Sequence, residues 1–163
     1  HLRYIFHDTL KEVALKDELQ EVNDYYHIIM LDMSRPFLLK QEVSQELFGK
    51  KVPPLAIQTF LENTYKYAGN EANILMFRIE ITLVNHEGRN YLRIHLSDNG
   101  PGYPQEVLDS INSISNAHSF SKDHVGISNL IHRMQLLYGD DFQVAFYNEG
   151  ERNAHSLLYI PVL

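Results

Sequence analysis

Hydrophobic positions between residues 52 and 68 recur at the spacing of an α-helix. One face of that helix would carry an apolar stripe formed by Ile57, Phe60, Leu61, Thr64 and Ala68. The opposite face would carry the polar residues Thr59, Glu62, Asn63 and Lys66, with Tyr67 beside them. Two prolines at the start suit a first turn, where amide protons have no helical partner. The pattern therefore predicts a central helix over Val52–Ala68, whose polar face is either a solvated surface or a functional site.

A second helical pattern occupies the start of the chain and predicts a helix over His1–Met33. Its stretch KEVALKDELQEV is rich in strong helix formers and in pairs of opposite charge. The step Arg35-Pro36 would end the helix, because a residue before proline avoids the helical region. Its rough apolar stripe consists of Leu10, Val13, Leu15, Leu19, Val22, Tyr26, Ile29 and Met30. Such a helix could lie on the domain or extend from it toward a partner helix.

Alternation of apolar and polar residues predicts the strands of a sheet. The predicted strands are Phe37–Val43 at a sheet edge, Ile74–Asn85, Asn90–Leu96, Phe142–Tyr147 and Ser156–Val162. His86–Arg89 and Asn148–Gly150 have the composition of hairpin turns. Further helices are predicted near Gln105–Ile111 and over Val125–Tyr138, the latter with Gly139 as its stop. This order predicts an α+β fold: a two-layer α/β sandwich with a mixed, mostly antiparallel sheet, helices on one face and an N-terminal helix.

Composition narrows the classes of function. The chain has 163 residues, enough for one domain with a core, and a formal net charge of −7. Lys and Arg form no stripe, which argues against nucleic acid or an anionic membrane surface as the partner. The absence of cysteine excludes disulfides and thiolate chemistry. We find no apolar run long enough to span a bilayer and no signal peptide, and the start without Met suggests an excised fragment.

Two loops carry candidate chemistry of their own. Asp98 follows a predicted strand and precedes Gly100 and Gly102, so a carboxylate at the sheet edge would lie beside backbone that a flat ligand can approach. The same sequence could be an ordinary turn. Gly126 opens a predicted helix, where free amides and the helix dipole favour an anion. Between the two loops, the Ser- and Asn-rich segment within Tyr103–Asp123 predicts a mobile lid.

Other kinds of site find little support. The nine histidines include no pair with HExxH or CxxC-type spacing, which disfavours zinc. No GxSxG elbow supports a serine nucleophile. The strand aromatics are expected to be core residues rather than a platform for stacked bases, namely Phe77, Tyr91, Phe142, Phe146 and Tyr159.

Three motifs, taken together, resemble a known family. Glu62–Tyr67 (ENTYKY), Asp98–Gly102 (DNGPG) and Val125–Asn129 (VGISN) occur in the order and spacing of the Bergerat-fold ATPases. More narrowly, they resemble the ATP-binding catalytic domain of bacterial sensor histidine kinases. The run PPLAIQTFLEN resembles the short-lid, autolysin-sensor-like subfamily, whose pattern is PPL-x-LQ-x-LVEN. The pairs Arg3-Tyr4, Glu18-Leu19 and Tyr25-Tyr26 also match that subfamily, so the resemblance covers nearly the whole chain.

The resemblance implies ATP and Mg²⁺ as cofactors and assigns a role to each motif. Asn63 would hold Mg²⁺ through its amide oxygen, and Glu62 would polarise the attacking nucleophile. Lys66 would reach a phosphate, with Tyr67 lining the same pocket. Asp98 would accept the exocyclic amine of adenine. The remaining nucleotide contacts would come from Gly100 and Gly102 near the base, and from His124, Val125, Gly126, Ile127 and Asn129 near the phosphates, under a closing lid.

The resemblance also implies how the chain is organised. Residues 1–36 would form a helical linker toward an upstream dimerisation and phosphoacceptor region, and residues 37–163 the ATP-binding catalytic domain. The domain would transfer the γ-phosphoryl group to an upstream histidine, which then serves a response regulator. The full protein would be a homodimer and a membrane-bound bacterial sensor, with this domain in the cytoplasm. The fragment lacks that histidine, so it would not autophosphorylate.

Three departures from the family pattern leave alternatives open. His124 stands where the phosphate-lid motif has glycine, Tyr67-Ala68 where the subfamily has His-Gly, and Asn153-Ala154 where Gly-Thr is usual. The chain could therefore be a degenerate nucleotide-binding regulatory module that does not transfer phosphate. It could also be a Bergerat-fold ATPase in which Glu62 activates water.

Overall fold

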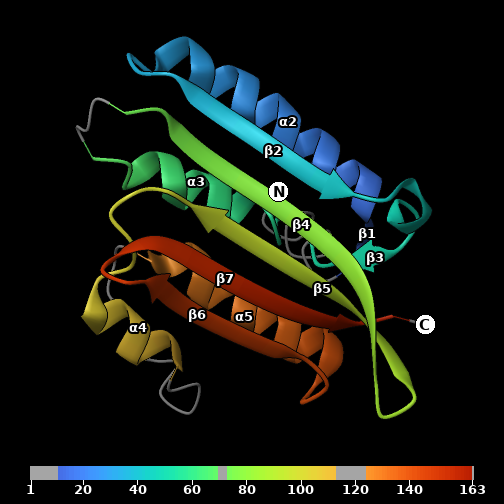
Figure 1. The fold of residues 1–163 in the computed structure, drawn as a ribbon. Coiled ribbons are helices and arrows are strands. Elements are labelled where there is room, and N and C mark those ends of the chain that lie inside the picture. Colours follow the sequence, from blue (N-terminus) through green and yellow to red (C-terminus); the bar gives the residue numbers. More distant parts are fainter. Residues whose placement is uncertain (1–10, 70–72, 113–123, 163) are drawn as a thin grey trace, which may run out of the picture.

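The computed structural model describes residues 11–69, 73–112 and 124–162. Its centre is a five-stranded sheet with the order β2-β4-β5-β7-β6 (Figure 1). The strands are β2 (Phe37–Val43), β4 (Leu75–His86), β5 (Arg89–Asp98), β6 (Gln143–Glu149) and β7 (Arg152–Pro161). β2 pairs with β4 in parallel, and the other pairs are antiparallel. The predicted mixed, mostly antiparallel α/β sandwich is confirmed, with β2 as an edge strand.

The helices cover one face of this sheet (Figure 1). They are α2 (Leu15–Asp32), the 3-10 turn η1 (Gln45–Leu47), α3 (Gln58–Lys66), α4 (Gln105–Asn112) and α5 (Val125–Tyr138). α2 packs on α3, and the hydroxyl of Tyr26 donates a hydrogen bond of 2.6 Å to the carbonyl of Phe37 in β2. A small second sheet pairs β1 (Val13–Ala14) with β3 (Lys51–Val52). None of the helices in these described ranges is both long and apolar enough to cross a membrane.

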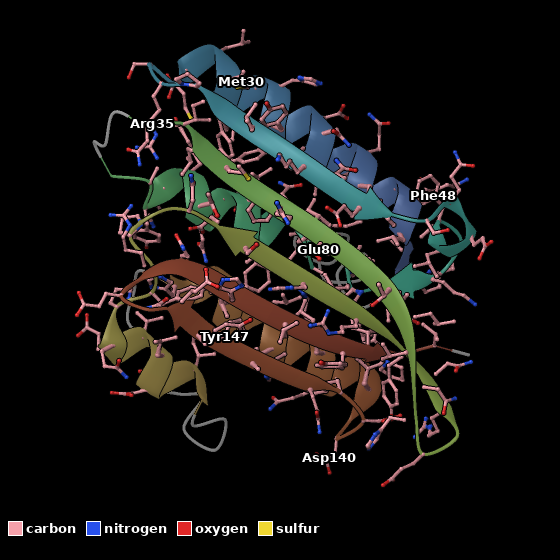
Figure 2. All side chains as sticks on the ribbon, viewed as in Figure 1. Met30, Arg35, Phe48, Glu80, Asp140 and Tyr147 are labelled. Atoms are coloured by element: carbon pink, nitrogen blue, oxygen red, sulfur yellow. The ribbon has the colours of Figure 1, made fainter. Side chains whose placement is uncertain are left out.

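The core lies between the sheet and the helices, as the period of the apolar residues predicts. It joins one face of β4 and β5 with α2, α3 and α5 in a single cluster of buried side chains. The predicted stripe of α3 is buried throughout, and so are Phe77 and Phe146 among the strand aromatics. The other face of the sheet is turned toward the viewer in Figure 2 and carries polar side chains such as Glu80.

Two predicted helix starts are wrong, for tertiary reasons. In the described part of the predicted N-terminal helix, the helical residues begin at Leu15 as α2, because Val13–Ala14 forms backbone pairs with Lys51–Val52 instead; residues 1–10 lie outside the described part. The central helix begins at Gln58, and its two prolines lie in the preceding turn. Leu55, just after them, has a φ of 65°, which is incompatible with a right-handed helix.

The other predicted elements differ less from the structure. β7 begins four residues before the predicted Ser156, because its first residues pair with the end of β6 across an irregular register at Asn148 and Glu149. The short helix near Gln105–Ile111 is confirmed as α4. Most of the predicted lid, residues 113–123, lies outside the described residues.

Candidate nucleotide-binding site

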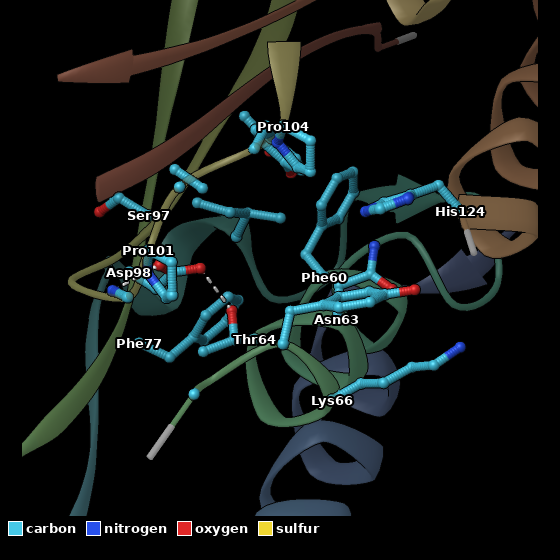
Figure 3. A pocket seen from close by; sticks show the side chains of 18 residues that line it. Phe60, Asn63, Thr64, Lys66, Phe77, Ser97, Asp98, Pro101, Pro104 and His124 are labelled. Atoms are coloured by element: carbon cyan, nitrogen blue, oxygen red, sulfur yellow. Dashed lines mark hydrogen bonds between the residues drawn. The ribbon is translucent and has the colours of Figure 1, made fainter. Parts of the chain in front are cut away.

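A cavity of about 410 Å³ lies between α3, the loop after β5 and the start of α5 (Figure 3). Seven of the residues singled out from the sequence line it: Asn63, Lys66, Tyr67, Asp98, Gly100, Gly102 and His124. This volume falls in the usual range for small-molecule sites. The fold therefore brings segments together that are far apart in the sequence.

Asp98, the last residue of β5, is held at one end of the cavity by hydrogen bonds from α3 and from the backbone around it. The Thr64 hydroxyl of α3 donates to Oδ2 at 2.8 Å (Figure 3), and the Gly100 amide donates to Oδ1 at 2.8 Å. Burial raises the pKa of Asp98, whereas these hydrogen bonds oppose the rise because they favour the carboxylate. The result is a fixed, partly desolvated acceptor that can distinguish a ligand amine from a ligand carbonyl.

The loop after Asp98 needs both of its glycines. A Cβ on Gly100 would lie 3.1 Å from Asp98 Oδ1. Gly102 has a φ of +87°, and a Cβ there would lie 3.0 Å from the side chain of Asn148. Asn148 of β6 in turn holds the backbone of Tyr103, accepting from its N–H and donating to its carbonyl at 2.8 Å each. Larger side chains would push the loop away from the carboxylate and from β6.

The other end of the cavity carries the groups expected near phosphates. The rings of Tyr67 and His124 stack with their centroids 4.8 Å apart and an angle of 11° between planes. Lys66 Nζ lies 5.3 Å from the centroid of the Tyr67 ring. Asn63 Nδ2 is buried and has no hydrogen-bond partner within the described ranges, so its carboxamide is available to a ligand. In Figure 3, Asn63 and His124 lie across the cavity from Asp98.

Sequence comparisons identify sensor proteins as relatives of this chain. No protein-family model matches it. The sensor protein LytS of Staphylococcus saprophyticus is 31% identical over 139 residues, which is 85% of this chain and 23% of LytS. The sensor protein kinase HptS of Staphylococcus aureus is 25% identical over 161 residues, which is 99% of this chain and 30% of HptS. The chain thus spans under a third of the length of these relatives.

Several solved structures that share this fold are histidine kinase domains. The histidine kinase domain of the blue-light activated kinase EL346 from Erythrobacter litoralis matches with a TM-score of 0.60 and 15% identity, over 92% of this chain and 66% of that one. The catalytic domain of histidine kinase ThkA, in a nucleotide-free form, matches with a TM-score of 0.56 and 16% identity, over 93% of this chain and 94% of that one. By sequence this chain is related to sensor proteins, and its fold is that of histidine kinase catalytic domains. Full-length ShkA in complex with AMPPNP matches with a TM-score of 0.57 and 15% identity, over 93% of this chain and 31% of ShkA.

The remaining predicted site residues of this chain lie outside the cavity lining. Glu62 is exposed on α3 and accepts a hydrogen bond of 3.0 Å from Gln58 Nε2. Ile127 is fully buried in the core, and Val125 and Asn129 are exposed in the first turns of α5. Gly126 is also exposed, but a Cβ on it would point toward α3 and would lie 3.1 Å from Thr59 Cγ2. Close helix packing is therefore one reason for a glycine at this position.

Some contacts around the cavity are not predicted by the sequence pattern. The spacing predicts Thr64 on the apolar stripe, and Thr64 is 5% exposed, but its hydroxyl donates to the Asp98 carboxylate. Tyr103 and Ser156 share a hydrogen bond of 2.6 Å at the cavity wall, and burial raises the pKa of Tyr103. Asn99, inside the DNG motif, points away from the ligand side and binds the backbone of β4 through Met76 N–H at 2.7 Å. For Thr64, the sequence offers one signal of such a contact, because a polar residue lies on a stripe that is otherwise predicted to be apolar core. The other contacts have no comparable signal.

The donor set fits a nucleotide with its magnesium ion. Asn63 offers a hard amide oxygen, which suits Mg²⁺, and the side-chain nitrogen beside it is buried and unpartnered in the part of the chain that the structure describes. Within that part, no group of three or more His, Cys, Asp or Glu side chains could hold a metal ion. A magnesium ion here would therefore take its other ligands from phosphate oxygens and water.

Proposed function

We propose that this chain is a histidine kinase catalytic domain, which binds Mg-ATP in the cavity and transfers the γ-phosphoryl group to a histidine on a dimerisation helix of the whole protein. The observation that carries the proposal is the carboxylate of Asp98, fixed by Thr64 and Gly100 at the cavity end. A fixed carboxylate favours the exocyclic amine of adenine, whereas guanine would present a carbonyl oxygen to it. The site is therefore expected to select ATP over GTP.

The phosphates would extend from this end toward α3 and the start of α5. Asn63 would contribute its amide oxygen to Mg²⁺, and Lys66 would place its ammonium group on a phosphate oxygen. The ion, when bound, neutralises charge that builds up on the transferred group. The His124 ring, 4% exposed and stacked on Tyr67, would close the cavity against water on that side.

Glu62 has an arrangement that suits transfer to an outside acceptor. Its side chain is exposed next to Asn63, where an imidazole from another helix could approach. In the transfer, a bond forms between the imidazole nitrogen and Pγ while the bond from Pγ to the β–γ bridging oxygen breaks and ADP leaves. Glu62 would accept the proton that the imidazole loses. The phosphohistidine would then serve a response regulator, in a homodimeric protein with this domain in the cytoplasm.

A second candidate function is nucleotide binding without transfer. It is favoured by the stack of His124 on Tyr67, since an imidazole there replaces the glycine typical of the family and narrows the phosphate end. A third reading, hydrolysis of ATP, would use Glu62 to activate water instead of a histidine.

One experiment separates these functions. Calorimetric titration with AMPPNP, with and without Mg²⁺, measures binding, and incubation with a separate polypeptide that carries the phosphoacceptor histidine measures transfer. We expect Mg²⁺-dependent binding, and transfer that Glu62→Gln abolishes without loss of affinity. Binding without transfer would favour the regulatory module, and steady hydrolysis that Glu62→Gln removes would favour the ATPase. No binding at millimolar nucleotide would refute all three.

A further inference from the structure

Glu18 of α2 is a buried carboxylate directed at the start of α3. It is 2% exposed, and its two oxygens accept three backbone hydrogen bonds. Oε1 accepts from Leu55 N–H at 2.9 Å, and Oε2 accepts from Ile57 N–H at 3.1 Å and Gln58 N–H at 3.0 Å. Burial raises the pKa of Glu18, and the three donors act against that rise. A carboxylate is costly to bury, so these contacts must be maintained for the arrangement to persist.

The start of α3 depends on this contact because the helix has no cap of its own. Its N-cap residue, Ile57, makes no side-chain capping bond, and its first turn contains no acidic residue. The first N–H groups of a helix need acceptors from elsewhere, and a negative charge there is favoured by the helix dipole. Glu18 supplies both from a different helix.

The turn before α3 is held from two sides. Leu55 adopts a φ of 65°, in the left-handed region that is unfavourable for leucine. Glu18 binds its N–H from α2, while Arg133 of α5 donates from Nη2 to the carbonyl of Pro54 at 3.2 Å. The strained turn is therefore kept in place by the two helices that flank α3.

α2 also contacts the other end of α3. The hydroxyl of Tyr65 donates a hydrogen bond to Oδ2 of Asp32, the last residue of α2. Tyr65 immediately precedes Lys66, and the segment between the two contacts carries Asn63 and Thr64 into the cavity. α2 thus fixes α3 at both ends of the segment that bears the site.

We propose that Glu18 is a positioning residue for the nucleotide site, through which α2 sets the affinity for Mg-nucleotide. The inference rests on the proposed function, because it concerns the same cavity. Asp98 belongs to the sheet, whereas Asn63 and Lys66 belong to α3, so their spacing depends on where α3 lies. The 2.8 Å hydrogen bond between Thr64 and Asp98 leaves little tolerance for a shift of the helix.

The test compares Glu18→Gln with Glu21→Gln, the same change at an exposed position of the same helix. Calorimetry with AMPPNP and Mg²⁺ gives both the dissociation constant and the number of sites per chain. We expect Glu18→Gln to raise the dissociation constant about tenfold with one site per chain retained, which corresponds to about 1.4 kcal/mol. We expect Glu21→Gln to match the wild type. A merely structural role would instead lower the number of sites and the urea midpoint while leaving the constant unchanged.

If Glu18→Gln fails to fold, a second measurement on the wild type still tests the proposal. In the wild type, coupling is reciprocal, so bound Mg-nucleotide should slow hydrogen exchange at the Ile57 and Gln58 amides more than at η1. Equal exchange with and without nucleotide, or a folded Glu18→Gln with wild-type affinity, would overturn the role of Glu18 alone. A wild-type chain that binds no nucleotide would overturn the proposed function and this inference together.

Discussion

The hydroxyl of Thr64 and the carboxylate of Asp98 meet at 2.8 Å, although 34 positions separate them in the sequence. This contact joins α3, which carries the groups assigned to the phosphates, to the strand that ends in the group assigned to adenine. It defines the distance between the two ends of the site.

Replacement of Asp98 by asparagine is expected to weaken ATP binding by about 1–3 kcal/mol, because a charged buried acceptor is lost. The amide can turn its NH₂ group toward the base, where it opposes the amine of adenine and suits the carbonyl of guanine. The preference for ATP over GTP should therefore shrink as well. Calorimetry with both nucleotides measures the two effects. Asp140→Asn, at an exposed position after α5, serves as the matched control. Equal binding of ATP and GTP by the unmodified chain would contradict the role of Asp98.

Thr64→Val keeps the shape of the side chain and removes its hydroxyl. The pKa of Asp98 should rise further, because the lost hydrogen bond favours the carboxylate. ATP affinity should fall by about three- to tenfold, as for one ordinary hydrogen bond. NMR titration of the Asp98 carboxyl carbon and calorimetry give the two quantities. Thr82→Val, on an exposed position of β4, should change neither, and an unchanged Asp98 pKa in Thr64→Val would refute the coupling.

Asn63→Ala is expected to abolish the dependence of nucleotide affinity on Mg²⁺, because the amide ligand of the ion is removed. Titrations of AMPPNP with and without the ion should then give similar dissociation constants. Glu62→Gln alters the neighbouring exposed position and should keep the Mg²⁺ dependence of the wild type. Wild-type affinity and Mg²⁺ dependence in Asn63→Ala would remove the basis for the magnesium assignment.

The uncovered face of the sheet predicts a pH effect on stability. His95 Nε2 lies 2.9 Å from His155 Nδ1, and burial, followed by the charge of His155, lowers the pKa of His95. The folded state therefore binds fewer protons than the unfolded state, so stability is present above the ordinary histidine pKa and falls as the pH drops below about 6.5. Urea unfolding between about pH 5.5 and 8 measures this slope.

His95→Gln should flatten the pH dependence, because the titrating ring is removed. His132→Gln changes an exposed histidine of α5 and should leave the slope as in the wild type. An identical slope in wild type and His95→Gln would show that the histidine pair does not link protonation to folding.

The period of apolar residues determined most of the secondary structure. β2 and α5 have the predicted bounds, and the α3 stripe is buried, because local spacing alone decides which side chains can share a face. The motifs around Asn63 and Asp98 also supply part of the cavity lining, because both residue type and order along the chain define them. The spacing, type and order of residues can be read from the sequence without three-dimensional information.

Tertiary packing decided where α3 begins and how the site is held together. Glu18 lies 40 positions from Gln58, yet it caps α3, and the strained Leu55 turn replaces the first predicted helical turn. Thr64 has the spacing of a core residue, and only the end of β5 packed against it turns its hydroxyl into a support for Asp98. Such contacts depend on which backbone or side-chain atoms, distant in the sequence, come within about 3 Å of each other. A periodic pattern gives no information about that distance. The sequence by itself determined the elements and the residue types at the site, and the packing of α2 and β5 on α3 decided their geometry.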